Sequence, residues 1–122
     1  MASLFKNIEH SQVYDLAGLV DYQKGKVASL TLSQQTGVGV TLFAIDEGEG
    51  LKTHSAPGDA MANILDGQVE ITIGDEKHVL EAGQAVVMPA GIPHSLTALK
   101  PFKMMLVLIK APKVQKLDDM GA

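Results

Sequence analysis

The chain of 122 residues has no cysteine, no arginine and no tryptophan, and it has only two tyrosines and three phenylalanines. Without cysteine it can form no disulfide, no iron–sulfur cluster and no zinc–thiolate site. Without arginine it lacks the planar guanidinium group that binds phosphates and guanine through two hydrogen bonds at once. Too few aromatic rings remain for stacking with bases. Because the formal net charge is also −4, we expect no binding to nucleic acid.

Long apolar runs are missing as well. The longest strongly apolar stretch covers residues 104–109, whereas a membrane-spanning helix needs ~20 residues. The first ten residues, MASLFKNIEH, lack the basic start and apolar run of a secretion signal. We therefore expect a cytoplasmic protein with no membrane partner.

What is present is the composition of one folded domain, with 46% hydrophobic and 20% charged residues. Apolar and polar residues alternate along residues 68–73 up to a Gly74-Asp75 turn, and residues 77–81 fit the returning strand of a hairpin. Residues 28–33 alternate in the same way. This period of two predicts half-buried β-strands.

In two further segments, residues 38–45 and residues 102–109, both the odd-numbered and the even-numbered positions are mostly apolar. That pattern is typical of strands covered on both faces. Glycine and proline interrupt the chain at short intervals, and many short strands favour a sandwich or a closed barrel. A short helical turn is expected only around residues 13–19.

Two of the four histidines, His54 and His94, lie in segments that resemble the two sequence motifs of the cupin superfamily. The first motif reads G-x5-H-x-H-x3-E-x6-G, and the residues that match it are Gly48, His54 and Gly67. The second motif reads G-x5-P-x-G-x2-H-x3-N, and the residues that match it are Gly83, Pro89, Gly91 and His94. The segments HSAPGDAM and MPAGIPH are also similar to a group of small bacterial cupins without an assigned activity.

The resemblance implies an all-β fold, the double-stranded β-helix or jelly-roll barrel in which two antiparallel sheets face each other. We expect this barrel over residues 25–111, an N-terminal extension over residues 1–24 and a polar C-terminal tail over residues 112–122. Small cupins commonly form homodimers with crossing N-terminal strands. We therefore expect a homodimer in which the extension could serve as an arm.

The departures from the family motifs concern the metal ligands. In metal-binding cupins two histidines and a glutamate of the first motif join the histidine of the second motif. Here the second histidine position is Ala56 and the glutamate position is Ala60, so that His54 and His94 remain. A catalytic site generally needs three protein ligands, so an iron, zinc, manganese or nickel cofactor is disfavoured. Asp59 becomes a third ligand only if the local register turns it inward, because neighbouring strand residues face opposite ways.

The same substitutions predict open space near the two histidines. Ala60 and Ala62 share one strand face and should line the barrel interior, and Ala56 replaces a larger residue. The result would be an apolar pocket with two converging imidazoles, which is typical of small-molecule sites. The alternative is an ordinary core in which methionines fill the space; the candidates are Met61, Met88, Met104 and Met105.

Three functions follow from this pattern. The first is a small-molecule-binding cupin that needs no metal, with its ligand between His54 and His94. The second is an enzyme: a metal-dependent dioxygenase, isomerase or lyase, or a metal-free isomerase in which a histidine is the general acid or base. The third is an interaction module whose pocket is vestigial. For the two histidines, the alternative to a chemical role is that each donates to a backbone carbonyl and only ties two strands together. His10 and His78 are expected at the solvated surface.

Overall fold

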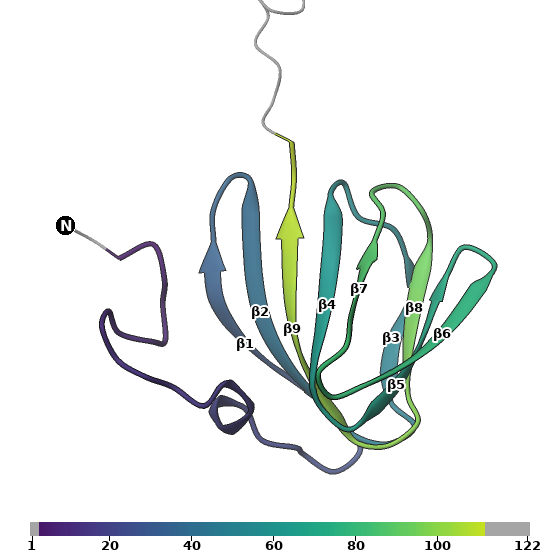
Figure 1. Cartoon of the computed structure of the whole chain (residues 1–122), viewed down its shortest axis with the longest axis horizontal. Coiled ribbons are helices and arrows are strands. Elements are labelled where there is room, and N and C mark those ends of the chain that lie inside the picture. The colour runs from purple at the N-terminus through teal and green to yellow at the C-terminus, as the bar shows by residue number, and fades with distance from the viewer. Residues whose placement is uncertain (1–2, 112–122) are drawn as a thin grey trace, which may run out of the picture.

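A computed structural model describes residues 3–111, and over this range the chain is built almost entirely of β-strands (Figure 1). The elements in chain order are the 3-10 helix η1 (Leu16–Leu19) and the strands β1 (Val27–Gln34), β2 (Val38–Ile45), β3 (Gly50–His54), β4 (Asp59–Asp66), β5 (Gln68–Ile73), β6 (Glu76–Glu81), β7 (Ala85–Met88), β8 (His94–Ala98) and β9 (Phe102–Ile109). The tail predicted over residues 112–122 lies outside the described residues. Among the helices described, none has the length and apolar character needed to cross a membrane.

The strands form two antiparallel sheets that face each other and confirm the predicted barrel (Figure 1). The five-stranded sheet has the order β1-β2-β9-β4-β7, and the four-stranded sheet has the order β3-β8-β5-β6. The hairpin expected around Gly74 is formed by β5 and β6, and Gly74 takes a φ of 58° that a side chain would disfavour. The last strand, β9, lies between β2 and β4.

The main core lies between the two sheets and is built by the alternation of the strands. Every second residue of each strand points inward, so side chains from both sheets meet there. Burying one large apolar side chain contributes about 1.5–3 kcal/mol. The buried members of this core are Ile45, Ala60, Ala62, Ile64, Val69, Ile71, Leu80, Met88, Leu96, Ala98, Phe102 and Met104.

A second core lies on the outer face of the five-stranded sheet, and it explains why β2 and β9 are apolar at both parities. Leu32, Leu42 and Ala44 are buried there beneath the N-terminal segment, which contributes Val20. The helical turn expected near residues 13–19 is the 3-10 helix η1 in this segment. The N-terminal segment runs along the β1 side of this sheet (Figure 1) and packs against part of its outer face.

Hydrogen bonds fasten the N-terminal segment in two places. Near its start, the backbone N–H of Lys6 donates to the Leu32 carbonyl at 2.8 Å, which satisfies part of the free edge of β1. Near its end, Tyr22 donates its hydroxyl hydrogen to Asp66. The Lys103 ammonium group donates to the Ala17 carbonyl at 2.6 Å and lies 4.8 Å from the centre of the Tyr22 ring.

Candidate functional site

Four of the residues considered above lie at one end of the barrel, because the strands that carry them begin or end there. β3 ends at His54, β4 begins next to Ala60, β7 ends at Met88 and β8 begins at His94. The two loops at this end, residues 55–58 and residues 89–93, are joined by a hydrogen bond of 2.9 Å from the Gly91 N–H to the Ala56 carbonyl. We call this end of the barrel, with its two loops, the histidine end.

The structure brings the two motif histidines into direct contact. His54 and His94 are partners across the β3–β8 ladder. Their ring centroids are 4.5 Å apart and the ring planes meet at 68°, an edge-to-face arrangement. The pairing predicted from the two motifs is therefore present in space, although the two residues are far apart in the sequence.

A β-bulge in β3 makes this contact. Leu51 pairs with Leu96 and His54 pairs with His94, so two residues of β3 oppose one residue of β8 between these pairs. Leu51 packs against the core, and in a regular strand His54 would face the opposite side. The bulge accommodates the extra residue, so that His54 nevertheless lies on the side of His94.

Gly50 fixes the position of β3 just before the bulge. A Cβ atom at this residue would lie 1.9 Å from the carbonyl oxygen of Leu96. Only glycine lets the two backbones approach so closely. The alternation of apolar and polar residues contains no sign of this close approach or of the bulge. Neither feature can therefore be predicted from the sequence.

The hydrogen bonds of the two histidines assign the same tautomer to both. Nδ1 of His54 lies 2.6 Å from the Lys52 carbonyl oxygen, and Nδ1 of His94 lies 3.2 Å from the Ile92 carbonyl oxygen. A carbonyl oxygen can only accept, so each Nδ1 carries the hydrogen. In the neutral ring Nε2 then keeps its lone pair and is free to act as an acceptor, a base or a metal ligand.

The two rings differ in exposure. His94 is 3% exposed, whereas His54 is exposed to solvent. Burial lowers the pKa of His94 because the charged form loses its hydration, and the nearby His54 lowers it further. The Ile92 carbonyl acts in the opposite direction. The net effect favours a neutral His94 ring at neutral pH.

The predicted small residues lie in the packed core rather than beside open space. Ala60 and Ala62 are 3% and 0% exposed, and they share the core with Met88 and Met104, which are also buried. Of the four candidate methionines, Met88 and Met104 fill the interior, whereas Met61 is 40% exposed and Met105 packs against the second core. Ala56 is half-buried in the loop after β3. The open side of the histidine pair is the side of His54.

Asp59 does not join the histidines. Its side chain is exposed, and its Oδ1 accepts the backbone N–H of Ala90 at 2.9 Å. Over residues 3–111 no group of three or more histidine, cysteine, aspartate or glutamate side chains could hold a metal ion. Two imidazoles alone do not fit a resident divalent cation, which generally takes three protein ligands. We therefore derive no reaction through a metal.

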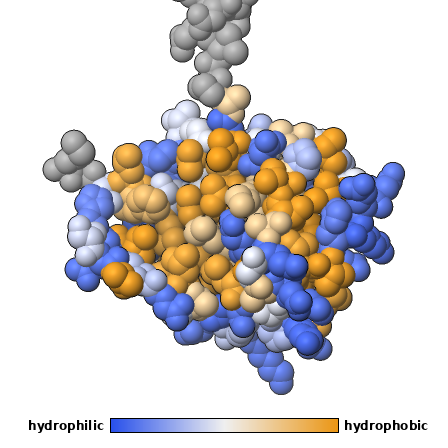
Figure 2. Space-filling model, in the orientation of Figure 1, coloured by the Kyte–Doolittle hydropathy of each residue, from blue (hydrophilic) through white to orange (hydrophobic). Residues whose placement is uncertain are grey.

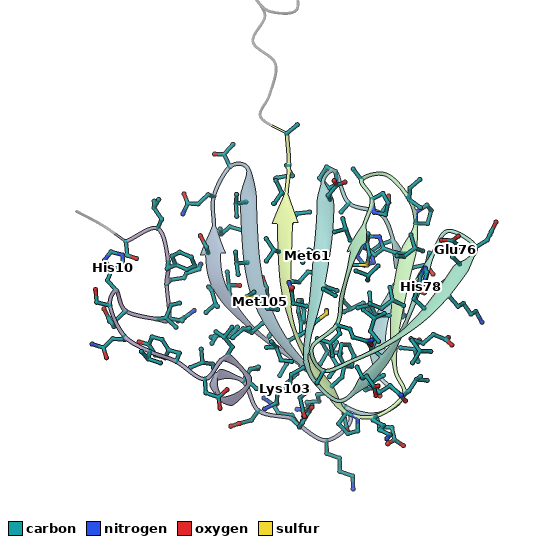
Figure 3. All side chains as sticks on the ribbon, in the orientation of Figure 1. His10, Met61, Glu76, His78, Lys103 and Met105 are labelled. Carbon is teal, nitrogen blue, oxygen red and sulfur yellow. The ribbon has the colours of Figure 1, made fainter. Side chains whose placement is uncertain are left out.

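The other two histidines lie at the surface, as predicted. His10 is exposed in the N-terminal segment, and His78 on β6 is 3.6 Å from the Glu76 carboxylate (Figure 3). Surface ion pairs of this kind contribute little to stability. Both residues are useful as controls for the pair at the histidine end.

Neither His54 nor His94 lines any of three cavities of the described structure. A groove of about 470 Å³ lies along β3 and β8, a cleft of about 240 Å³ lies beside His78 on β6 and Val86 on β7, and a cavity of about 330 Å³ is lined by Thr36, Pro57, Lys110 and Ala111. The groove along β3 includes Lys52. Because Lys52 follows Leu51, which packs against the core, the alternation of the strand directs this lysine to the outer side.

Comparison with known proteins agrees with the fold and with the motifs. The family model of the cupin domain matches residues 41–109. A conserved protein of unknown function from Streptococcus pyogenes is 45% identical, with 92% of this chain and 98% of that chain covered and a TM-score of 0.89. A cupin superfamily protein from Desulfitobacterium hafniense DCB-2 is 28% identical, with 89% and 100% covered and a TM-score of 0.84.

A third solved structure, a Cupin 2 conserved barrel domain protein from Leptotrichia buccalis, is 35% identical and has a TM-score of 0.76. The match covers 80% of this chain and 47% of that chain, so this chain corresponds to about half of the longer protein. Comparison with curated proteins gives no match. The function has to be argued from the site itself.

Proposed function

The chain belongs to the cupin family, and from this premise we propose that it is a small-molecule-binding cupin whose ligand contacts His54 and His94. The observation that supports the proposal most directly is the edge-to-face contact of the two rings at 4.5 Å, with both Nδ1 atoms engaged by backbone carbonyls. The contact leaves two Nε2 atoms as functional groups at one end of the barrel.

The apolar side of the proposed site is formed by small and aliphatic residues. His94 pairs with Ile73 on β5, and Ala60 pairs with both Met88 and Leu108 on the facing sheet. Ala56 adds a further small, half-buried side chain at this end, whereas Ala62 is fully buried in the core below it. Apolar walls around a few polar groups are typical of sites for small organic molecules. Because Met88 and Met104 fill the interior, the ligand lies at the histidine end, above the core.

A thermal-shift screen with sugars, keto acids and small aromatic compounds tests this proposal. A ligand at 100 times its Kd stabilises the folded state by about 2.7 kcal/mol, which corresponds to a rise in Tm of roughly 10 °C for a domain of this size. The stabilisation should disappear in His54→Ala, whose exposed ring can be removed without opening the core. It should persist in the matched control His78→Ala. A complete screen without any stabilising compound would contradict the proposal.

Metal content separates this proposal from the enzyme alternative. We expect less than about 0.1 equivalent of iron, zinc, manganese or nickel in protein purified without a tag or chelator, because two imidazoles bind such ions weakly. One equivalent that is lost in the double variant His54→Ala/His94→Ala would contradict a metal-free binding site. That result would instead favour a metal-dependent dioxygenase, isomerase or lyase.

We further propose a homodimer that forms through the outer face of the five-stranded sheet. Figure 2 shows that this face is largely apolar, and Figure 3 shows Met61 and Met105 on it. The N-terminal segment covers only part of the face, and the large apolar side chains that stay exposed on it are Val38, Met61, Val87 and Ile109, at 38%, 40%, 48% and 58%. A two-fold axis would place this apolar patch against its own copy, with the exposed Asp59 on β4 at its margin beside Ile109.

A further inference from the structure

The chemistry of the histidine end also restricts the class of ligand. Building on the function proposed above, we propose that the pair of His54 and His94 selects an uncharged molecule that donates a hydrogen bond, namely an apolar body with a hydroxyl group, and that it discriminates against carboxylates. Four observations on described residues support this selectivity: the tautomer of both rings, the accessibility of Nε2, the apolar surroundings and the positions of the nearest charged groups.

Both rings offer acceptors and no free donor. Each Nδ1–H is directed to a backbone carbonyl, at 2.6 Å for His54 and 3.2 Å for His94. The Nε2 atoms of the neutral rings therefore carry lone pairs. A hydroxyl group can donate to such a nitrogen, whereas a carboxylate brings only further lone pairs and would be repelled.

Nε2 of His94 is open to a ligand although the residue is 3% exposed. Within the described residues, no buried side-chain nitrogen or oxygen lacks a hydrogen-bond partner. The hydrogen bond given for His94 uses Nδ1 and not Nε2. Nε2 therefore borders accessible space, next to the exposed ring of His54.

The surroundings of the pair favour an apolar body. The cross-strand neighbour of His94 on the other side is the half-buried Ile73, and the half-buried residue on the facing five-stranded sheet, next to the buried Ala60, is Leu108. Apolar contact with such a surface contributes about 25 cal/mol per Å² removed from water. A strongly hydrophilic polyol would lose hydration there without finding enough partners.

Among the described residues, no charged side chain forms a hydrogen bond or an ion pair with either histidine of the pair. The Asp59 carboxylate accepts the Ala90 N–H. Lys52 lines the groove along β3 and β8 together with Ser95 and Thr97, and Lys110 lines the cavity beside Pro57. An anionic ligand would therefore find no ammonium group held against either ring.

A matched set of three probes tests the selectivity: 4-methylphenol, 4-methylanisole and 4-methylbenzoate share one apolar body and differ in the group that meets the histidines. Binding to the full-length protein is followed at pH 8, well above the usual imidazole pKa of about 6.5, by the ¹⁵N signals of the imidazole rings. We expect millimolar affinity for molecules this small. The phenol should bind about 3- to 10-fold more tightly than the ether, the difference of one hydrogen bond, and the carboxylate most weakly.

Variants sharpen the test. His54→Lys places a cation at the exposed position and should reverse the order of phenol and carboxylate. The control His78→Gln should leave the order and the affinities unchanged. The same spectra of the free protein should show the hydrogen of both rings on Nδ1, and a hydrogen on Nε2 of either ring would overturn the inference.

The two proposals can fail separately. Tighter binding of the carboxylate or the ether than of the phenol would overturn the proposed selectivity while small-molecule binding at His54 and His94 stands. No change in either imidazole with any of the three probes, up to the solubility limit, would overturn the binding proposal and the selectivity together. An unchanged preference in His54→Lys would show that the pair does not set the selectivity.

Discussion

The two sheets of the barrel share one core but differ on their outer faces. The five-stranded sheet is apolar on both sides: Leu42 and Ala44 on its outer face are as buried as Ile45 and Phe102 on its inner face. The four-stranded sheet is apolar only inside, and its outer residues, such as Glu70 and Thr72, are polar. A sheet with two apolar faces needs a second cover, and here the N-terminal segment supplies part of it.

The difference separates two tasks within one small domain. The five-stranded sheet provides surface for packing, first for the N-terminal segment and then, in our proposal, for a second copy of the chain. Both histidines come from the four-stranded sheet, from β3 and β8. The two histidines thus stand on the sheet with the more polar outer face, whereas Ala60 and Met88, on the apolar side of the proposed site, belong to the five-stranded sheet.

The largest effect should come from placing a charge on the proposed dimer face. Met61→Lys buries an unpaired ammonium group in the interface, which costs about 3–5 kcal/mol, so that the dimer should dissociate at least about 100-fold more readily. Val79→Lys places the same charge on the four-stranded sheet, where Val79 is 55% exposed. Sedimentation should show a monomer for the first variant and a dimer for the second. Wild-type protein that sediments as a monomer would refute the dimer.

The next effect should come from the second core. Leu42→Ala removes a fully buried side chain beneath the N-terminal segment, and the free energy of unfolding should fall by about 2–5 kcal/mol. Val79→Ala on the outer face of the four-stranded sheet should change it by less than about 0.5 kcal/mol. Urea unfolding measures both variants. Equal losses of unfolding free energy in the two variants would mean that the outer faces of the two sheets are equally important for stability.

A smaller effect is expected for the attachment of the N-terminal segment. Tyr22→Phe removes the hydrogen bond to Asp66 and should cost about 1 kcal/mol. Burial, and then Asp66, raise the pKa of the Tyr22 hydroxyl above its usual range, so the folded state favours the neutral phenol. This contribution is complete below the unfolded pKa of about 10 and is lost at higher pH. The stability difference between wild type and Tyr22→Phe should therefore shrink above pH 10, and a constant difference would contradict this.

The smallest effect concerns the four-stranded sheet and the pH dependence of His94. Its pKa is lowered in the folded state, mainly by burial and then by His54. The unfolded state therefore binds the proton more readily, and stability should fall as the pH drops below the unfolded value of about 6.5. The acid-dependent loss should be weaker in His94→Gln. Identical pH profiles of the unfolding free energy in wild type and variant would contradict the prediction.

Much of the fold could be predicted because short-range patterns determine it. The Gly74-Asp75 turn between alternating segments specified the β5–β6 hairpin, and the matching of both motifs placed His54 beside His94. Apolar residues at both odd and even positions of residues 38–45 predicted that both faces of this strand are covered. They did not identify the cover, because the N-terminal segment has no strong period of its own and binds through backbone groups such as the Lys6 N–H.

The interior of the site was harder to predict. The loss of large residues at Ala56 and Ala60 suggested a pocket, but a packed barrel fills space with whatever side chains can reach it. Met88 occupies a position that the second motif leaves unspecified and Met104 lies outside both motifs, yet both side chains reach the core. The backbone carbonyls that orient the two imidazoles also leave no trace in the sequence, because every residue carries one.

The bulge in β3 makes the histidine pair tolerant of a change in chain length. Two residues separate Leu51 from His54, but only one separates Leu96 from His94. Deleting one residue at position 52 or 53 would leave one residue on each strand, so a regular ladder would keep His54 opposite His94 and on the side of Leu51. A regular ladder at the present spacing would instead turn His54 to the outside, although no residue of the site had been replaced.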